Sequence, residues 1–208
     1  MSINKKEAET QAEKIVKKVM EENSYLSNIL QGVLSKDDSE RYPNAIALEL
    51  LSEKNPELLY PHWDFFADLL KSKNAYHRII AVTTISNLTL IDNDEKFEDI
   101  FDEYFRLLDD KSVIVTRKLT IYVGRVAKAK PLLRVKIKDI LLSIDDTQHS
   151  TSRKDLIKGD IVESLSEFFE YIEDKDKIIK FVKKQLSSSS PSTIKKAKEF
   201  LSKWDQLL

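Results

Sequence analysis

The sequence of 208 residues has no cysteine, three glycines and five prolines. The absence of cysteine excludes disulfides, thiolate nucleophiles, cysteine-ligated zinc and iron–sulfur clusters. It also fits a reducing compartment, so we expect a cytoplasmic protein. The scarcity of glycine argues against strand-rich folds and phosphate-binding loops, because both need glycine at tight turns.

Long apolar runs and an excess of one charge are also missing. No run approaches the ~20 residues that span a bilayer, so we expect no membrane association. The segment from Met1 to Asn23 is charged throughout and lacks the apolar core of a secretory signal. The formal net charge of -1 argues against a globally basic nucleic-acid binder, although it leaves local patches open.

Recognisable catalytic and cofactor-binding motifs are absent as well. The sequence has no HExxH, GxGxxG or Walker pattern and no nucleophile elbow. Its three histidines lack metal-ligand spacing. We expect His77 to be solvated at the start of a helix and His149 to lie in a polar loop from Asp145 to Asp155. We therefore expect no catalytic residue, no metal site and no cofactor.

Apolar residues at helical spacing run through most of the chain. A typical stripe is formed by Leu26, Ile29, Leu30 and Val33. The glycines fall inside such stripes rather than in loops, and they are Gly32, Gly124 and Gly159. We expect four prolines near the first turns of helices, where proline is best tolerated. These are Pro43, Pro56, Pro131 and Pro191. The pattern predicts an all-α fold.

A repeat becomes visible when the second helix of each predicted pair is aligned. Basic residues spaced by 37, 39 and 41 positions recur in these helices, namely Arg41, Arg78, Arg117 and Lys158. An amphipathic helix that ends in a short polar turn precedes each of them. A period near 40 with two helices per unit is typical of HEAT or armadillo solenoids.

Two segments carry a resemblance to the HEAT repeat family. The segment from Pro61 to Leu70 and the later Arg78-Ile79-Ile80-Ala81 resemble a HEAT repeat. That repeat has a proline in its first helix, paired leucines, an acidic turn and an Arg-x-x-Ala in its second helix. The turn Asp109-Asp110-Lys111-Ser112 followed by Arg117 is similar to the same pattern.

The resemblance covers about residues 24 to 204 and has structural implications. It implies a single domain over residues 1–208, a right-handed α-solenoid of about four to five helix pairs, with residues 1–23 as an N-terminal capping helix. It also implies structural roles for Arg78 and Arg117, because such arginines bond to an acidic residue of the turn or of the neighbouring repeat. The chain departs from the pattern at Lys158 and at Ile194, and Arg41 precedes Pro43, so its place in the helix stays open.

The charges are distributed asymmetrically along the chain. Residues Asp92 to Asp110 contain nine acidic and two basic residues, whereas Lys111 to Lys138 contain nine basic and no acidic ones. Helical spacing places Lys118, Tyr122 and Arg125 on one face, and Lys128 extends it. The resemblance implies that this face belongs to a concave surface, where it could bind phosphates or an acidic protein segment. Alternatively, the adjacent acidic helix neutralises the patch and Tyr122 belongs to the core.

Two functions follow from these patterns. The first is a non-catalytic scaffold that presents a concave surface to a protein partner. The alternative is a DNA-binding protein or a glycosylase similar to the HEAT-like DNA alkylation repair enzymes, which use a Trp and an Asp near a concave surface. Its candidates would be Trp63 with Asp64 or Asp68, together with the basic segment 111–138. Trp63, however, lies at a position that normally faces the core.

Overall fold

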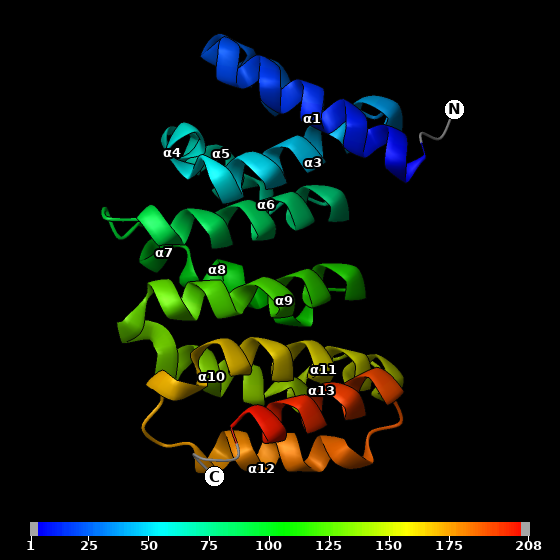
Figure 1. Ribbon diagram of the computed structural model, residues 1–208, viewed down its shortest axis with the longest axis vertical. Helices are drawn as coiled ribbons and strands as arrows, with labels where there is room; N and C mark the ends of the chain where they lie inside the picture. The colour runs from blue at the N-terminus through cyan, green and yellow to red at the C-terminus, as the bar shows by residue number, and fades with distance from the viewer. Residues whose placement is uncertain (1–3, 205–208) are drawn as a thin grey trace. The chain divides into compact units, whose positions relative to one another are not determined.

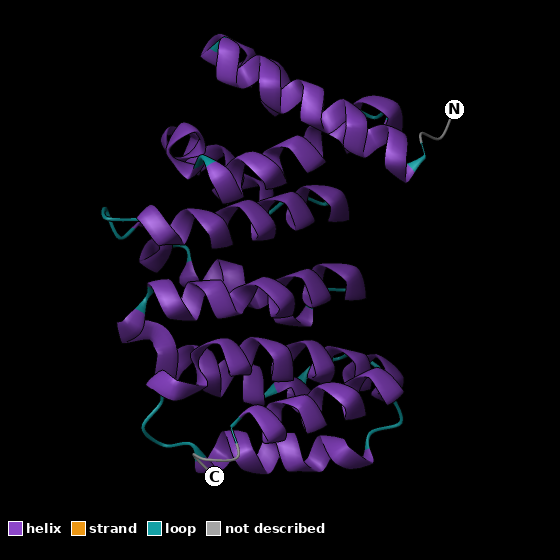
Figure 2. Ribbon diagram, viewed as in Figure 1, coloured by secondary structure: helices purple, strands orange, loops and turns teal. Residues whose placement is uncertain are grey.

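The computed structural model describes residues 4–204. Every regular element within this range is an α-helix (α) or a 3-10 helix (η), and no strand occurs in it (Figure 2). The predicted all-α class is therefore confirmed. No helix in this part of the chain is long and apolar enough to cross a bilayer. The chain forms two compact units, Met1–Phe97 and Glu98–Leu208.

The first unit contains a series of helices joined by short turns (Figure 1). They are α1 (Lys5–Glu21), η1 (Asn23–Tyr25), α2 (Leu26–Gly32), α3 (Asp38–Lys54), α4 (Pro56–Leu59), η2 (Tyr60–His62), α5 (Trp63–Leu69), α6 (Ala75–Leu88) and η3 (Thr89–Ile91). The short α7 (Lys96–Asp99) spans the boundary between the units. Helix α1 packs on α3, and α6 packs on α3 and α5. The predicted N-terminal helix over residues 1–23 corresponds to α1, and residues 1–3 lie outside the described part.

Two long helices of the first unit, α3 and α6, begin in the same way. The Asp37 carboxylate accepts a hydrogen bond from the backbone N–H of Ser39 at 2.9 Å. The Asn74 side chain accepts one from the N–H of Tyr76 at 3.0 Å. Both side chains satisfy an N–H group that has no partner inside its helix. The local sequence thus fixes both helix starts.

An arginine four residues after each of these caps reaches back to the preceding turn. Arg41 Nη1 donates to the Ser35 carbonyl at 3.1 Å, and Arg78 Nη1 donates to the Ser72 carbonyl at 2.7 Å. Arg78 is 4% exposed. Each bond joins residues that are six positions apart. The recurring arginine therefore links the first turn of its helix to the turn that precedes it.

The prediction for the prolines was correct at three positions and wrong at the fourth. Pro56, Pro131 and Pro191 are each the first residue of a helix. Pro43 instead lies inside α3, because the Asp37 cap starts that helix further upstream. The same cap places Arg41 within the helix.

The C-terminal part of helix α6 is fully enclosed. Every residue from Ile80 to Leu88 is buried, whereas Tyr76 in the first turn is exposed. Two of its polar side chains are satisfied, since Ser86 Oγ donates to the Val82 carbonyl at 2.7 Å and Asn87 Nδ2 donates to Ser52 Oγ at 2.8 Å. This helix therefore belongs to the core over most of its length.

The second unit is also built entirely from helices in its described part (Figure 1). They are α8 (Phe101–Arg106), η4 (Leu107–Asp109), α9 (Val113–Ala129), η5 (Pro131–Leu133), α10 (Arg134–Leu142), η6 (Ile144–Asp146), α11 (Thr151–Phe168), η7 (Phe169–Tyr171), α12 (Asp176–Lys184), η8 (Gln185–Ser187) and α13 (Pro191–Lys203). Helix α11 lies between α9 and α13 and packs on both. At one end of this row, the Phe169 ring contacts Phe200 at 4.9 Å between centroids and Trp204 at 5.2 Å.

The predicted loop from Asp145 to Asp155 is mostly helical. Helix η6 occupies its start and α11 begins at Thr151, which leaves residues 147–150 between them. His149, expected in a polar loop, is buried, and its Nε2 lies 3.1 Å from Thr116 Oγ1 and 3.2 Å from the Leu108 carbonyl oxygen. The segment looked like a loop because its composition is polar, but His149 anchors it to the preceding helices.

The row α9–α11–α13 shares one buried carboxylate. Asp160 on α11 is 1% exposed. It accepts hydrogen bonds from Arg117 on α9, at 2.7 Å from Nε and 3.3 Å from Nη2, and from Lys196 Nζ on α13 at 2.8 Å. Donation to Asp160 raises the pKa of Arg117. Burial lowers the pKa of Lys196, but its hydrogen bonds to Asp160 and Glu163 outweigh this and raise it. The carboxylate thus joins three helices at once.

Substitution of Asp160 tests the importance of this bond. Asp160→Ala should lower the free energy of unfolding by about 2 kcal/mol, because it leaves two cations without their shared acceptor. The cost should stay below that of a fully buried pair, since the side chains of Arg117 and Lys196 are 41% and 23% exposed and can turn to water. Urea unfolding followed by circular dichroism measures the change. Glu170→Ala, at an exposed position of η7, should alter stability little, and equal losses in both variants would contradict the assignment.

Candidate functional site

The residues predicted to form a basic and aromatic face lie together on α9. The Tyr122 ring has Lys118 Nζ at 5.2 Å and Arg125 Cζ at 4.7 Å from its centroid. Each such contact contributes about 0.5–1 kcal/mol at a partly exposed site. Tyr122 is 7% exposed, so its ring is both part of the core and a platform for the two cations. The burial of Tyr122 agrees with the core alternative, and the binding role of this face stays a prediction.

Lys128 lies one turn further along α9, and its charge acts on the carboxyl group of Glu167. Glu167 on α11 is half-buried, and burial raises the pKa of its carboxyl. The charges of Lys128 and then Arg125 act in the opposite direction without cancelling the effect of burial. The face around Lys118, Tyr122, Arg125 and Lys128, here called the α9 cluster, is thus bordered by an acidic group.

The close approach of α11 to this part of α9 depends on Gly124. A Cβ atom at this position would lie 2.7 Å from the Glu167 carboxyl carbon and 3.1 Å from the Ser164 carbonyl oxygen. Ser164 Oγ donates to the Thr120 carbonyl across the same contact. The sequence placed Gly124 correctly in a helix, but periodicity alone did not indicate its role at a helix–helix contact.

The rest of the basic segment 111–138 is not part of the α9 cluster. Arg117 is bonded to Asp160, as described above. Lys130 Nζ pairs with Glu98 at 2.9 Å, and Lys136 Nζ pairs with Asp102 at 3.2 Å. These two carboxylates belong to the acidic segment 92–110, which therefore neutralises part of the basic one. Arg134 Nε donates to the Ala127 carbonyl at 2.8 Å.

The residues considered for base recognition are not arranged for it. Trp63 is 2% exposed and makes an edge contact with Tyr60 at 5.8 Å between ring centroids. Asp64 and Asp68 are exposed on α5. A buried Trp cannot stack on a flipped base without leaving the core, so the structure places Trp63 where the core interpretation expected it.

His77 differs from the expectation that it is solvated. Its Nδ1 lies 3.0 Å from Ser72 Oγ, and its buried Nε2 has no hydrogen-bond partner among the described residues. Desolvation, followed by the charge of Arg41, lowers the pKa of the imidazole. The cause is the compact turn before α6, which the sequence did not reveal.

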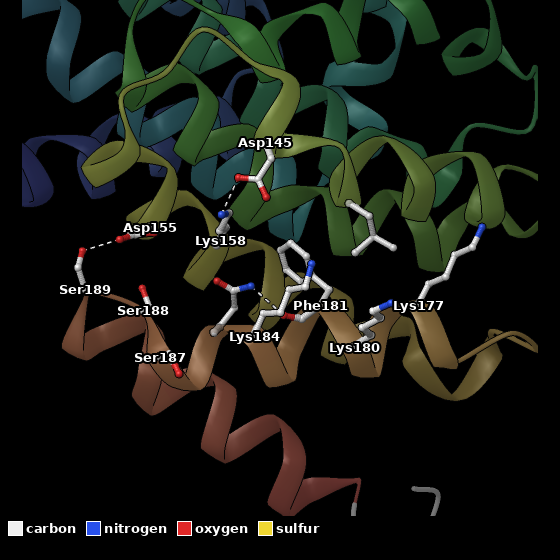
Figure 3. A pocket seen from close by; sticks show the side chains of 12 residues that line it. Asp145, Asp155, Lys158, Lys177, Lys180, Phe181, Lys184, Ser187, Ser188 and Ser189 are labelled. Carbon is white, nitrogen blue, oxygen red and sulfur yellow. Dashed lines mark hydrogen bonds and ion pairs between the residues drawn. The ribbon is translucent and has the colours of Figure 1, made fainter.

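A pocket in the second unit was missed by sequence reasoning. It has a volume of about 560 Å³ and lies among η6, α11, α12 and the Ser187–Ser189 segment (Figure 3). Three lysines of α12 line it, Lys177, Lys180 and Lys184. Their i, i+3, i+7 spacing places them on one helix face, and this spacing together with the following serine run was the available signal.

Within residues 4–204, no group of three or more His, Asp or Glu side chains is arranged to hold a metal ion.

Comparisons with known proteins relate the chain to a fold but not to a family. No protein-family model matches it, and no curated protein sequence matches it. The crystal structure of an engineered protein, a Northeast Structural Genomics Consortium target, is similar with a TM-score of 0.54. The two sequences are 15% identical, and the match covers 97% of this chain and 90% of the engineered one. At this identity the similarity concerns the fold alone.

The environment of His77 predicts a pH effect on stability. Because its folded pKa lies below the ordinary value of 6.5, the unfolded chain binds a proton first as the pH falls. The contribution of His77 is therefore present above pH 6.5 and is lost as the pH falls through the folded pKa. Urea midpoints between pH 8 and pH 5 should fall more steeply for the native chain than for His77→Gln. Parallel curves would show that His77 is not desolvated.

Glu167 predicts the opposite slope. Its folded pKa lies above the ordinary value of 4.5, so its contribution is present below pH 4.5 and is lost as the pH rises through the folded pKa. The stability of Glu167→Gln relative to the native chain should therefore increase from pH 4 to pH 7, as measured by urea unfolding. Glu173→Gln, at an exposed position, is the control and should show no such trend. A difference that stays constant for Glu167→Gln would contradict the burial of its carboxyl.

Proposed function

We propose that the chain is a non-catalytic helical repeat module of HEAT-like type that binds a protein partner. The binding surface is the face of the second unit where α9, α11 and α13 lie side by side. The observation that carries the proposal is the α9 cluster, where Lys118 and Arg125 flank the Tyr122 ring next to the carboxyl of Glu167. Arginine side chains are enriched at protein interfaces, and the buried Tyr122 ring positions Arg125 and Lys118 from below.

The repeat character is supported by equivalent contacts. Arg41 and Arg78 lie 37 positions apart, and each makes the same bond to the turn before its helix. Arg117 instead pairs with Asp160 on the next long helix, and a contact of this kind is what the HEAT resemblance implies between neighbouring repeats. In this proposal α1 caps a right-handed array of about four to five helix pairs, and the protein acts in the cytoplasm without a cofactor.

The mixed charges on this face favour a protein partner over nucleic acid. Glu163 on α11 is 63% exposed and pairs with Lys196 Nζ at 2.8 Å. A hollow of about 350 Å³ between α11 and α13 continues the face, with Glu163, Lys196 and Lys203 in its lining. A phosphate backbone would meet these carboxylates as well as the cations, whereas a protein segment can present both signs. The buried position of Trp63 further weakens the glycosylase alternative.

Neutralising the α9 cluster tests the proposal. The triple variant Lys118→Gln, Arg125→Gln and Lys128→Gln should weaken binding to the partner by about tenfold or more, since it removes three charges from one interface. Affinity capture with the full chain, followed by titration of the purified partner, provides the measurement. Circular dichroism should show unchanged helicity.

The control variant removes three charges elsewhere. Lys71→Gln, Lys73→Gln and Lys183→Gln replace exposed lysines outside this face and should bind the partner like the native chain. A parallel titration with alkylated and unmodified duplex DNA at two salt concentrations covers the alternative. Salt-dependent binding to DNA that is lost in the α9 variant would overturn the protein-binding proposal.

A further inference from the structure

The pocket beside α12 concentrates positive charge in a concave space. Lys177, Lys180 and Lys184 enter its lining from α12, and Lys158 enters from α11 (Figure 3). The opposite charges in the lining are Asp145 and Asp155. Four lysines against two carboxylates leave an excess of positive charge, and the concave shape strengthens its field.

The three lysines of α12 are available to a ligand. None of them forms an ion pair with another residue in the range 4–204. The neighbouring Lys158, by contrast, pairs with the Asp145 carboxylate at 2.6 Å. Asp155 accepts a hydrogen bond from Ser189 Oγ at the other side of the pocket, as Figure 3 shows. The carboxylates therefore already have partners, whereas the α12 lysines have none among these residues.

The lining of the pocket also contains a buried aromatic side chain and three serines. Phe181 is 8% exposed, and Gln185 Nε2 donates to the Phe181 carbonyl at 2.8 Å, which fixes the end of α12. Ser187, Ser188 and Ser189 supply hydroxyl groups at the rim. A volume of about 560 Å³ lies within the range of sites for small molecules.

We propose that this pocket binds a small molecule that carries two or more phosphate groups. Lysines act as point charges and are suited to phosphate, whereas planar carboxylates are best recognised by the paired donors of arginine, which the lining lacks. Lys177 and Lys184 are seven residues apart, or roughly 10 Å along the helix axis, so the positive charge extends along the pocket and suits several phosphate groups better than one. This site is separate from the α9 cluster and does not depend on the proposed function.

Asp145 acts as an internal competitor in this site. Its carboxylate occupies Lys158 and repels an incoming anion. Asp145→Asn should therefore bind the anion several-fold more tightly than the native chain, because it frees Lys158 and removes one negative charge. A fold defect cannot produce such a gain, which separates this result from simple damage.

The main experiment is calorimetric titration of the full chain with tripolyphosphate. We expect saturable binding that weakens as salt is raised. The double variant Lys180→Gln/Lys184→Gln should bind about tenfold more weakly or worse, since each lost contact is a hydrogen bond between charged groups. The control Lys183→Gln/Lys198→Gln removes two exposed lysines that do not line the pocket, and it should bind like the native chain.

Two further ligands define the chemistry of the site. Sulfate at matched ionic strength carries one anionic group and should bind far more weakly than tripolyphosphate. ATP in place of tripolyphosphate distinguishes a nucleotide from an inorganic polyphosphate, and lysine-dependent binding of either supports the proposal. Equal affinity for sulfate, equal losses in the two double variants, or no gain in Asp145→Asn would overturn it.

Discussion

The second unit depends on one buried carboxylate held between two cations from different helices. Asp160 is almost completely buried, and the burial of a carboxylate without a partner would be energetically costly. Arg117 and Lys196 compensate this cost from opposite sides, and both reach the carboxylate from helices that flank α11. The relative position of α9, α11 and α13 is therefore restricted to arrangements in which both cations reach the same group. The faces formed by this row depend on that restriction.

Much of the fold could be predicted from the sequence, because helix formation leaves local traces. The apolar spacing indicated the helices, and the recurring arginine at positions 41 and 78 corresponds to a repeated bond to the preceding turn. The choice of Asp160 as the partner of Arg117 could not be predicted, because the two residues are 43 positions apart and the chain is rich in acidic residues. The helical form of the segment after Asp145 was missed because its polar composition conceals the buried His149.

The same holds for the candidate site, where the grouping of residues on one helix could be predicted and the contacts between helices could not. The grouping of Lys118, Tyr122 and Arg125 follows from helix geometry alone, and the structure brings them together. The position of Glu167 next to them requires the contact of α11 with α9 at Gly124, which only the folded chain shows. In the same way, the α12 lysines share a helix face in the sequence, but their pocket exists because η6, α11 and the serine segment surround it. One unit thus carries two differently charged surfaces, one mixed in sign and one strongly positive.

The burial of α6 determines how its backbone amides exchange with solvent. Its residues from Ile80 to Leu88 are all buried, and two of its polar side chains bond within the protein. Local fluctuations expose backbone amides only where a segment can separate from its neighbours, and the buried part of α6 cannot do so alone. The amides of Ile80 to Leu88 should therefore exchange with solvent only when the packing around this part of α6 is lost, so their exchange rates report how stable that packing is.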